Sequence, residues 1–145
     1  MLKGMSKLFT GDLLKALCDM GHGDKAAIVD ANFPAYTIGK RVISFPGSSA
    51  TEILEAILPV FPLDHVEANP ALLMDMTDED RAVMEEPDIW DEFSDMVHRA
   101  YGDSRVVGKL SRNDFYQMSK ECYVIIQSGE ERLYGNIILF KGVVK

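Results

Sequence analysis

Apolar side chains recur at helical spacing in three parts of the chain, at 12–20, 53–58 and 88–101. A glycine, a common residue at the end of a helix, directly follows the first and the last of these segments. The serine and glutamate of 49–52 have the spacing of a capping box ahead of the second. We therefore expect three helices here, and a fourth that begins after Ser111, another possible capping residue.

Short apolar runs rich in β-branched residues lie between these helical segments and are typical of buried strands. They occur at 26–29, 41–45, 71–76, 105–110, 122–126 and 136–140. Because strands and helices alternate along the chain, the pattern predicts the α/β class. We expect one three-layer domain over 1–145, with a mostly parallel or mixed central sheet flanked by helices.

Composition narrows the set of partners. The chain has 145 residues, a formal net charge of -8 and a pI near 4.8, so its surface repels phosphate backbones and anionic lipid. No apolar run approaches a membrane span, and the start of the chain does not resemble a secretory signal. We therefore expect no nucleic acid, no membrane and a cytoplasmic location. Cys18 and Cys122 lie in apolar sequence surroundings, which predicts free, mostly buried thiols.

Several familiar catalytic motifs are missing from the sequence. It has no glycine-rich phosphate loop, no dinucleotide-binding fingerprint, no CxxC pair and no HExxH. The three histidines lie far apart without the spacing of metal ligands, so no metal site is expected. The acidic run 78–86 is interpreted as a solvated helix face, and Trp90 and Phe93 as core or subunit contacts.

Three places combine residue types that handle polar ligands. The first is the segment 21–24 with Asp30, which follows a predicted strand, and ligands favour the carboxyl ends of strands in α/β sheets. The second is Arg112 ahead of the aromatic pair 115–116, and the third is the segment 134–136. Each has an ordinary structural explanation as a helix stop, a helix start or a turn, so spacing alone leaves their role open.

In combination, these blocks resemble the family of ribose pyranases and fucose mutarotases over almost the whole chain. The resemblance rests on 20–24 and 30–35 near the start and on 128–130 and 134–143 near the end. It is closest to the fucose branch, since Arg112 stands where ribose-type members usually have His and Gly135 where they more often have Ala.

This resemblance implies a set of site residues and an assembly. By it, His22 matches the catalytic acid of the family. The positions that match sugar contacts are Asp30, Arg112, Tyr134, Gly135 and Asn136. It also implies ring-shaped homo-oligomers, often decamers, with sites near subunit interfaces, where apolar side chains such as Trp90 and Phe93 would be covered.

The implied reaction suits these side chains. Interconverting the anomers of a free monosaccharide such as L-fucose opens and recloses the ring, which needs proton transfers but no electrons and therefore no cofactor. A histidine titrates near neutral pH and can give a proton to the ring oxygen, the role we expect for His22. Tyr134, or a water that it orients, would act on the anomeric hydroxyl, while Asp30, Arg112 and Asn136 hold the ring.

Three other functions remain open from the sequence. A D-ribose pyranase would exchange pyranose and furanose rings with the same histidine. A non-catalytic sugar-binding accessory of a sugar transporter would bind sugar without faster exchange. In a purely structural oligomer, substitutions at Asp30 and Asn136 would have no effect on sugars.

Overall fold

A computed structural model describes residues 2–102 and 107–145 and confirms the layered α/β domain. Its six strands form one mixed sheet in the order β2-β5-β1-β6-β3-β4. Every parallel pair lies among β1 to β5, whereas β6 runs antiparallel to both of its neighbours. The strands are β1 (Lys25–Val29), β2 (Val42–Phe45), β3 (Ala71–Met74), β4 (Val107–Leu110), β5 (Val124–Ser128) and β6 (Ile137–Phe140).

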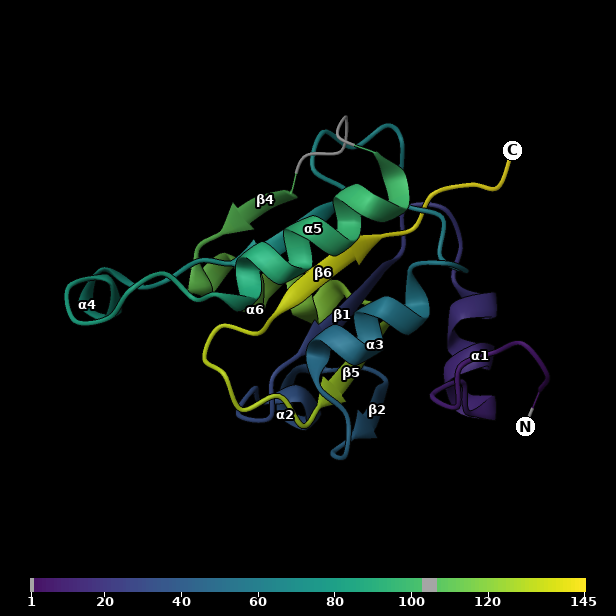
Figure 1. The fold of residues 1–145 in the computed structure, drawn as a ribbon, viewed down its shortest axis with the longest axis horizontal. Helices are drawn as coiled ribbons and strands as arrows, with labels where there is room; N and C mark the ends of the chain where they lie inside the picture. Colours follow the sequence, from purple (N-terminus) through teal and green to yellow (C-terminus); the bar gives the residue numbers. More distant parts are fainter. Residues whose placement is uncertain (1, 103–106) are drawn as a thin grey trace.

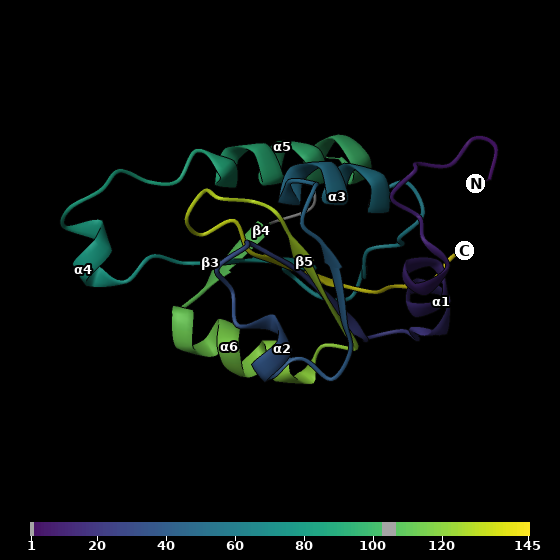
Figure 2. The ribbon, with the colours of Figure 1, turned by 90° about the horizontal axis from the view of Figure 1, so that it is seen from below.

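Helices cover both faces of the sheet. In Figure 2, α3 and α5 lie on one side of the sheet and α2 and α6 on the other, while α1 lies near one end. The helices are α1 (Gly11–Asp19), α2 (Ala35–Ile38), α3 (Ala50–Ile57), α4 (Asp78–Arg81), α5 (Ile89–Tyr101) and α6 (Arg112–Glu121). The predicted capping box forms at the start of α3, and Ser111 caps α6.

The reversed direction of β6 decides which residues meet. Asp30 follows β1, Arg112 lies just beyond β4, and Asn136 precedes β6, so all three lie at the same edge of the sheet. We call this the pocket edge. His22 precedes β1 and Lys141 follows β6, which places both at the opposite edge, called here the histidine edge.

The core corrects two expectations from the sequence. Trp90 and Phe93 are buried within the chain, where α5 packs against α3, so the core alternative is confirmed and they offer no spare surface to an interface. Cys18 is exposed on the outer side of α1, whereas Cys122 is buried as expected, and both are free thiols. Burial raises the pKa of the Cys122 thiol to about 12, which makes it unreactive.

Element boundaries were predicted to within a few residues, with two exceptions. The short helices α2 and α4 were not predicted as separate elements. The strand expected at 105–110 is seen from 107 on, since 103–106 lie outside the described residues. Helix α4 has no buried residue, and its segment projects away from the body of the molecule (Figure 1). Among the described helices, none is both long enough and apolar enough to cross a membrane.

Candidate functional site

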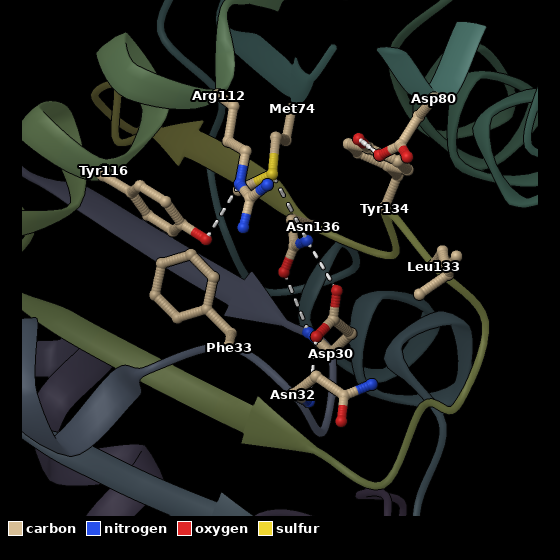
Figure 3. A pocket seen from close by; sticks show the side chains of 10 residues that line it. All are labelled: Asp30, Asn32, Phe33, Met74, Asp80, Arg112, Tyr116, Leu133, Tyr134 and Asn136. Carbon is tan, nitrogen blue, oxygen red and sulfur yellow. Dashed lines mark hydrogen bonds between the residues drawn. The ribbon is translucent and has the colours of Figure 1, made fainter. Parts of the chain in front are cut away.

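A pocket of about 150 Å³ opens at the pocket edge of the sheet. This is smaller than most drug-sized sites and suits one small polar molecule. Figure 3 shows side chains from the loop after β1, from β3, α4 and α6, and from the loop before β6 turning toward the same space. The pocket is lined by Asp30, Asn32, Phe33, Met74, Asp80, Arg112, Tyr116, Leu133, Tyr134 and Asn136.

Asp30 and Asn136 form a reciprocal pair at the floor of the pocket. The Asn136 amide Nδ2 donates to the Asp30 carboxylate at 2.7 Å, and the Asn136 Oδ1 accepts from the Asp30 backbone N–H at 2.9 Å. Burial raises the pKa of the Asp30 carboxyl, although hydrogen bonds from Asn136 and the Asn32 N–H oppose the shift. The pair is therefore a rigid, pre-arranged acceptor for ligand hydroxyls.

Arg112 adds the positive charge of the pocket. Its Nε donates to the Tyr116 hydroxyl at 3.3 Å, and this hydrogen bond is the main reason that the pKa of Arg112 is raised. The Tyr116 ring rests on Phe33, with 5.4 Å between ring centroids. One wall of the pocket is thus aromatic, and a fixed guanidinium stands beside it.

Tyr134 occupies an unusual position. Its φ of 62° makes it the one non-glycine residue with positive φ among the described residues. The Trp90 indole holds this backbone by donating to the Tyr134 carbonyl at 3.3 Å. The Tyr134 hydroxyl donates to the Asp80 carboxylate and accepts from the Thr77 backbone N–H at 3.3 Å. Such over-determined strain is common where a side chain must be aimed at a ligand.

Gly135 has a packing role in the structure. A Cβ there would lie 2.8 Å from Cγ of Glu130 and 3.2 Å from Cδ1 of Ile89, so a larger residue would push the loop outward. Gly135 is not among the pocket-lining residues. Its direct contact with sugar therefore stays a prediction.

The structure does not bring His22 to this pocket. Seven residues separate His22 from Asp30, and five of them form β1, a strand about 16 Å long. At the histidine edge, the His22 Nε2 lies 3.2 Å from Oδ1 of Asp64, and the His22 side chain is 50% exposed. Burial of Asp64 opposes its ionisation, but the hydrogen bonds from the Val66 N–H and His22 outweigh it and lower the Asp64 pKa.

Sequence reasoning missed Asp64 and Asp80. Asp64 lies in a region without recognisable motifs, and Asp80 lies in the acidic run that was interpreted as a solvated helix face. Neither has a periodic signal, because each is defined by a contact with a residue more than 40 positions away. Within the described part of the chain, no group of three His, Cys, Asp or Glu side chains could hold a metal ion.

Known proteins with related sequences share nearly the full length of this chain. The model of the "RbsD / FucU transport protein family" matches residues 3–144. A human protein named fucose mutarotase is 38% identical over 146 residues, with 99% of this chain and 94% of the relative covered. An L-fucose mutarotase of Haemophilus influenzae is also 38% identical, over 143 residues, covering 99% of this chain and 97% of the relative.

Solved structures match the fold as well. The fucose mutarotase of Streptococcus pneumoniae, solved in complex with L-fucose, superposes with a TM-score of 0.92 at 37% identity, covering 99% of this chain and all of the other. RbsD of Bacillus subtilis, solved with D-ribose, superposes with a TM-score of 0.70 at 23% identity and full coverage of both chains, a likeness of fold alone. The resemblance that the sequence motifs indicated is thus confirmed, and this chain belongs to the RbsD / FucU transport protein family.

Proposed function

We propose that this protein is an L-fucose mutarotase, which interconverts the α and β anomers of the free sugar by acid–base ring opening and closing. The observation that carries the proposal is the pocket that joins the Asp30–Asn136 pair, Arg112 and Tyr134 in one small space. Relatives named for this activity are 38% identical over nearly the full chain, which supports the same substrate here.

The pocket has the hydrogen-bonding groups that a sugar ring requires. The Asp30 carboxylate accepts from hydroxyls, the Arg112 guanidinium donates, and the Tyr134 hydroxyl lies at the same space. Phe33, Met74 and Leu133 add apolar surface, which a 6-deoxy sugar needs for its methyl group. No redox group takes part, because ring opening moves protons only.

We further propose that the acid of the reaction, His22, reaches the pocket from a second copy of the chain. Within one chain it lies at the opposite edge of the sheet, yet the Asp64 carboxylate orients its ring as a general acid requires. The histidine edge of one copy would cover the pocket edge of the next. Such a head-to-tail contact closes into a ring, in agreement with the homo-oligomer that the resemblance implies. We place this assembly in the cytoplasm, where free monosaccharides are metabolised.

A D-ribose pyranase is the nearest alternative function. The fold is compatible with it, but the ribose-bound relative is only 23% identical, and Arg112 and Gly135 match the fucose branch. Saturation-transfer proton NMR on equilibrated L-fucose and on D-ribose, with catalytic amounts of protein, separates the two. We expect faster exchange between the fucopyranose anomers. Acceleration of ribose exchange alone would move the assignment to the pyranase, and saturable binding without any acceleration would favour a binding accessory.

The shared site has its own test. At a fucose concentration well below KM, where His22→Gln and Asp30→Ala chains are each strongly impaired alone, the two chains co-expressed should recover about a quarter of the wild-type activity, because random mixing pairs an intact Asp30 with a neighbour's intact His22 at one site in four. No recovery from mixed oligomers would mean that both residues act from the same copy.

A further inference from the structure

We infer that Asp80 is a positioning residue for Tyr134. Its carboxylate accepts the hydrogen bond that the Tyr134 hydroxyl donates, so the tyrosine oxygen can only accept a hydrogen bond from the sugar. This inference rests on the proposed function and assigns the direction of one proton transfer in it. It follows from counting the hydrogen bonds that the Tyr134 hydroxyl makes, which Figure 3 displays in part beside the pocket.

A phenolic hydroxyl has one proton to donate and two lone pairs that accept. The Tyr134 proton goes to the Asp80 carboxylate, which has no proton of its own to give when ionised. One lone pair accepts from the Thr77 backbone N–H at 3.3 Å, a donor that no side-chain rotation can remove. A single lone pair is left for the pocket.

This remaining lone pair selects its partner on the sugar. A ring oxygen only accepts hydrogen bonds. It therefore cannot pair with the Tyr134 oxygen while the Tyr134 hydroxyl proton is donated to the Asp80 carboxylate. A sugar hydroxyl can donate, and the hydroxyl that must lose its proton for ring opening is the anomeric one. Tyr134 therefore acts at the anomeric hydroxyl, which leaves the ring oxygen to an acid elsewhere.

The proton transfer balances without any further reactant. As the bond between the anomeric carbon and the ring oxygen breaks, the acid gives a proton to the ring oxygen. The anomeric O–H proton passes to the Tyr134 oxygen, the Tyr134 proton passes to Asp80, and the anomeric carbon becomes a carbonyl. Ring closure on the other face returns each proton by the reverse path.

Asp80 is well placed for this role, and its carboxylate is not part of the core. It lies in α4, a four-residue helix that buries no side chain, so its carboxylate contributes little to the core. Thr77 both caps α4 through its hydroxyl, which accepts from the Asp80 N–H at 3.2 Å, and donates its own N–H to Tyr134. The first turn of α4 thus holds both partners of the Tyr134 hydroxyl, the Thr77 N–H and the Asp80 carboxylate, in place.

The test is a double-mutant cycle of Asp80→Asn and Tyr134→Phe, with rates from saturation-transfer NMR and sugar affinity from titration. Asn keeps the shape and an acceptor oxygen but cannot take a proton. We expect each single change to lower kcat by roughly a hundredfold with KM nearly constant. In the Tyr134→Phe background, Asp80→Asn should change kcat by less than about twofold, because the relay is already absent. Asp78→Asn, an exposed carboxylate of the same helix, is the matched control and should behave as wild type.

Independent, multiplying losses in the double variant, or a loss confined to KM, would overturn the inference. If Asp80→Asn does not fold, Asp80→Ala enters the same cycle. The Tyr134 hydroxyl proton gives a readout that needs no activity: its NMR resonance should lie downfield, vanish in Tyr134→Phe and move upfield in Asp80→Asn. A wild-type protein without effect on fucose exchange would defeat the proposed function, whereas an unmoved resonance would defeat the role of Asp80.

Discussion

The two edges of the sheet each hold a buried aspartate, but in different surroundings. At the pocket edge, Asp30 is buried against the neutral amide of Asn136, and burial raises its pKa. At the histidine edge, Asp64 pairs with the half-exposed His22, and its pKa is lowered. One edge has a cavity lined by hydrogen-bonding side chains, and the other has a half-exposed imidazole.

In the proposed mechanism, this difference explains why the site would need two copies of the chain. A pocket without an acid binds sugar but opens its ring slowly, and an exposed acid without a pocket has no substrate to protonate. The central strand β1 separates the two, and four of its five residues are completely buried in the core, so no local motion can bring them together. The comparison can be tested by breaking each edge separately.

The largest expected effect is at the histidine edge. His22→Gln should lower kcat for fucose anomer exchange by about 10²–10⁴-fold, because the general acid is lost, and should leave sugar affinity nearly unchanged. Saturation-transfer NMR measures the rate and titration calorimetry the affinity. His98→Gln, a half-buried histidine in the last turn of α5, is the control. An equal loss of affinity in His22→Gln would contradict the division between the edges.

The opposite pattern is expected at the pocket edge. Asp30→Ala removes a charged acceptor, worth about 1.5–3 kcal/mol, and should raise the sugar Kd by about 10–100-fold. Calorimetric titration with L-fucose measures the change, and circular dichroism checks that the chain still folds. Asp91→Ala, an exposed carboxylate on α5, provides the charge-matched control. Unchanged affinity in Asp30→Ala would remove the Asp30–Asn136 pair from the binding site.

A pH titration should distinguish the two edges, because sugar affinity and stability depend on different carboxyl groups. The change in sugar affinity should reach up to tenfold per pH unit. Sugar affinity should fall as pH falls through the Asp30 pKa, which lies above the ordinary 3.8, because the protonated acid loses its acceptor role. The fold should persist in this window. A raised folded-state pKa means that the native state binds the Asp30 proton more tightly than the unfolded chain, so protonation of Asp30 does not favour unfolding.

Asp64 behaves in the opposite sense. Its folded-state pKa is below the ordinary 3.8, so its contribution to stability is complete above that value and is lost as pH falls through the lowered pKa. Calorimetry of binding and of unfolding over the same pH series checks both acids. Loss of affinity and loss of fold at the same pH would contradict this order.

The smallest effect concerns the support of the histidine edge. The Lys141 ammonium donates to the Leu17 carbonyl at 2.6 Å and the Met20 carbonyl at 2.7 Å, at the end of α1 and just ahead of His22. Lys141→Met should lower the free energy of unfolding by about 1 kcal/mol, since these carbonyls lose their partner. Urea denaturation measures it. Lys15→Met, on the exposed side of α1, should have a smaller effect, and equal losses would deny Lys141 this capping role.

Local features of the fold were readable from the sequence. The helix boundaries followed from capping residues and from the period of apolar positions, and Ser49 and Ser111 cap the expected helices. The motif blocks also identified Asp30, Arg112, Tyr134 and Asn136 as one group, and the structure places all four around one pocket. The capping and periodicity signals are local in the sequence, and the site residues belong to motifs that the family shares.

The tertiary structure decided the rest. The sequence indicated that Asp30 follows one strand and Asn136 lies at the start of another, but only the antiparallel direction of β6 brings them into contact. Likewise, the sequence did not reveal Asp64 as the partner of His22 or Asp80 as the partner of Tyr134. The two members of each pair are more than 40 positions apart in the chain. The physical reason is that periodicity reports which face of an element is buried, whereas strand order and direction depend on packing between distant segments.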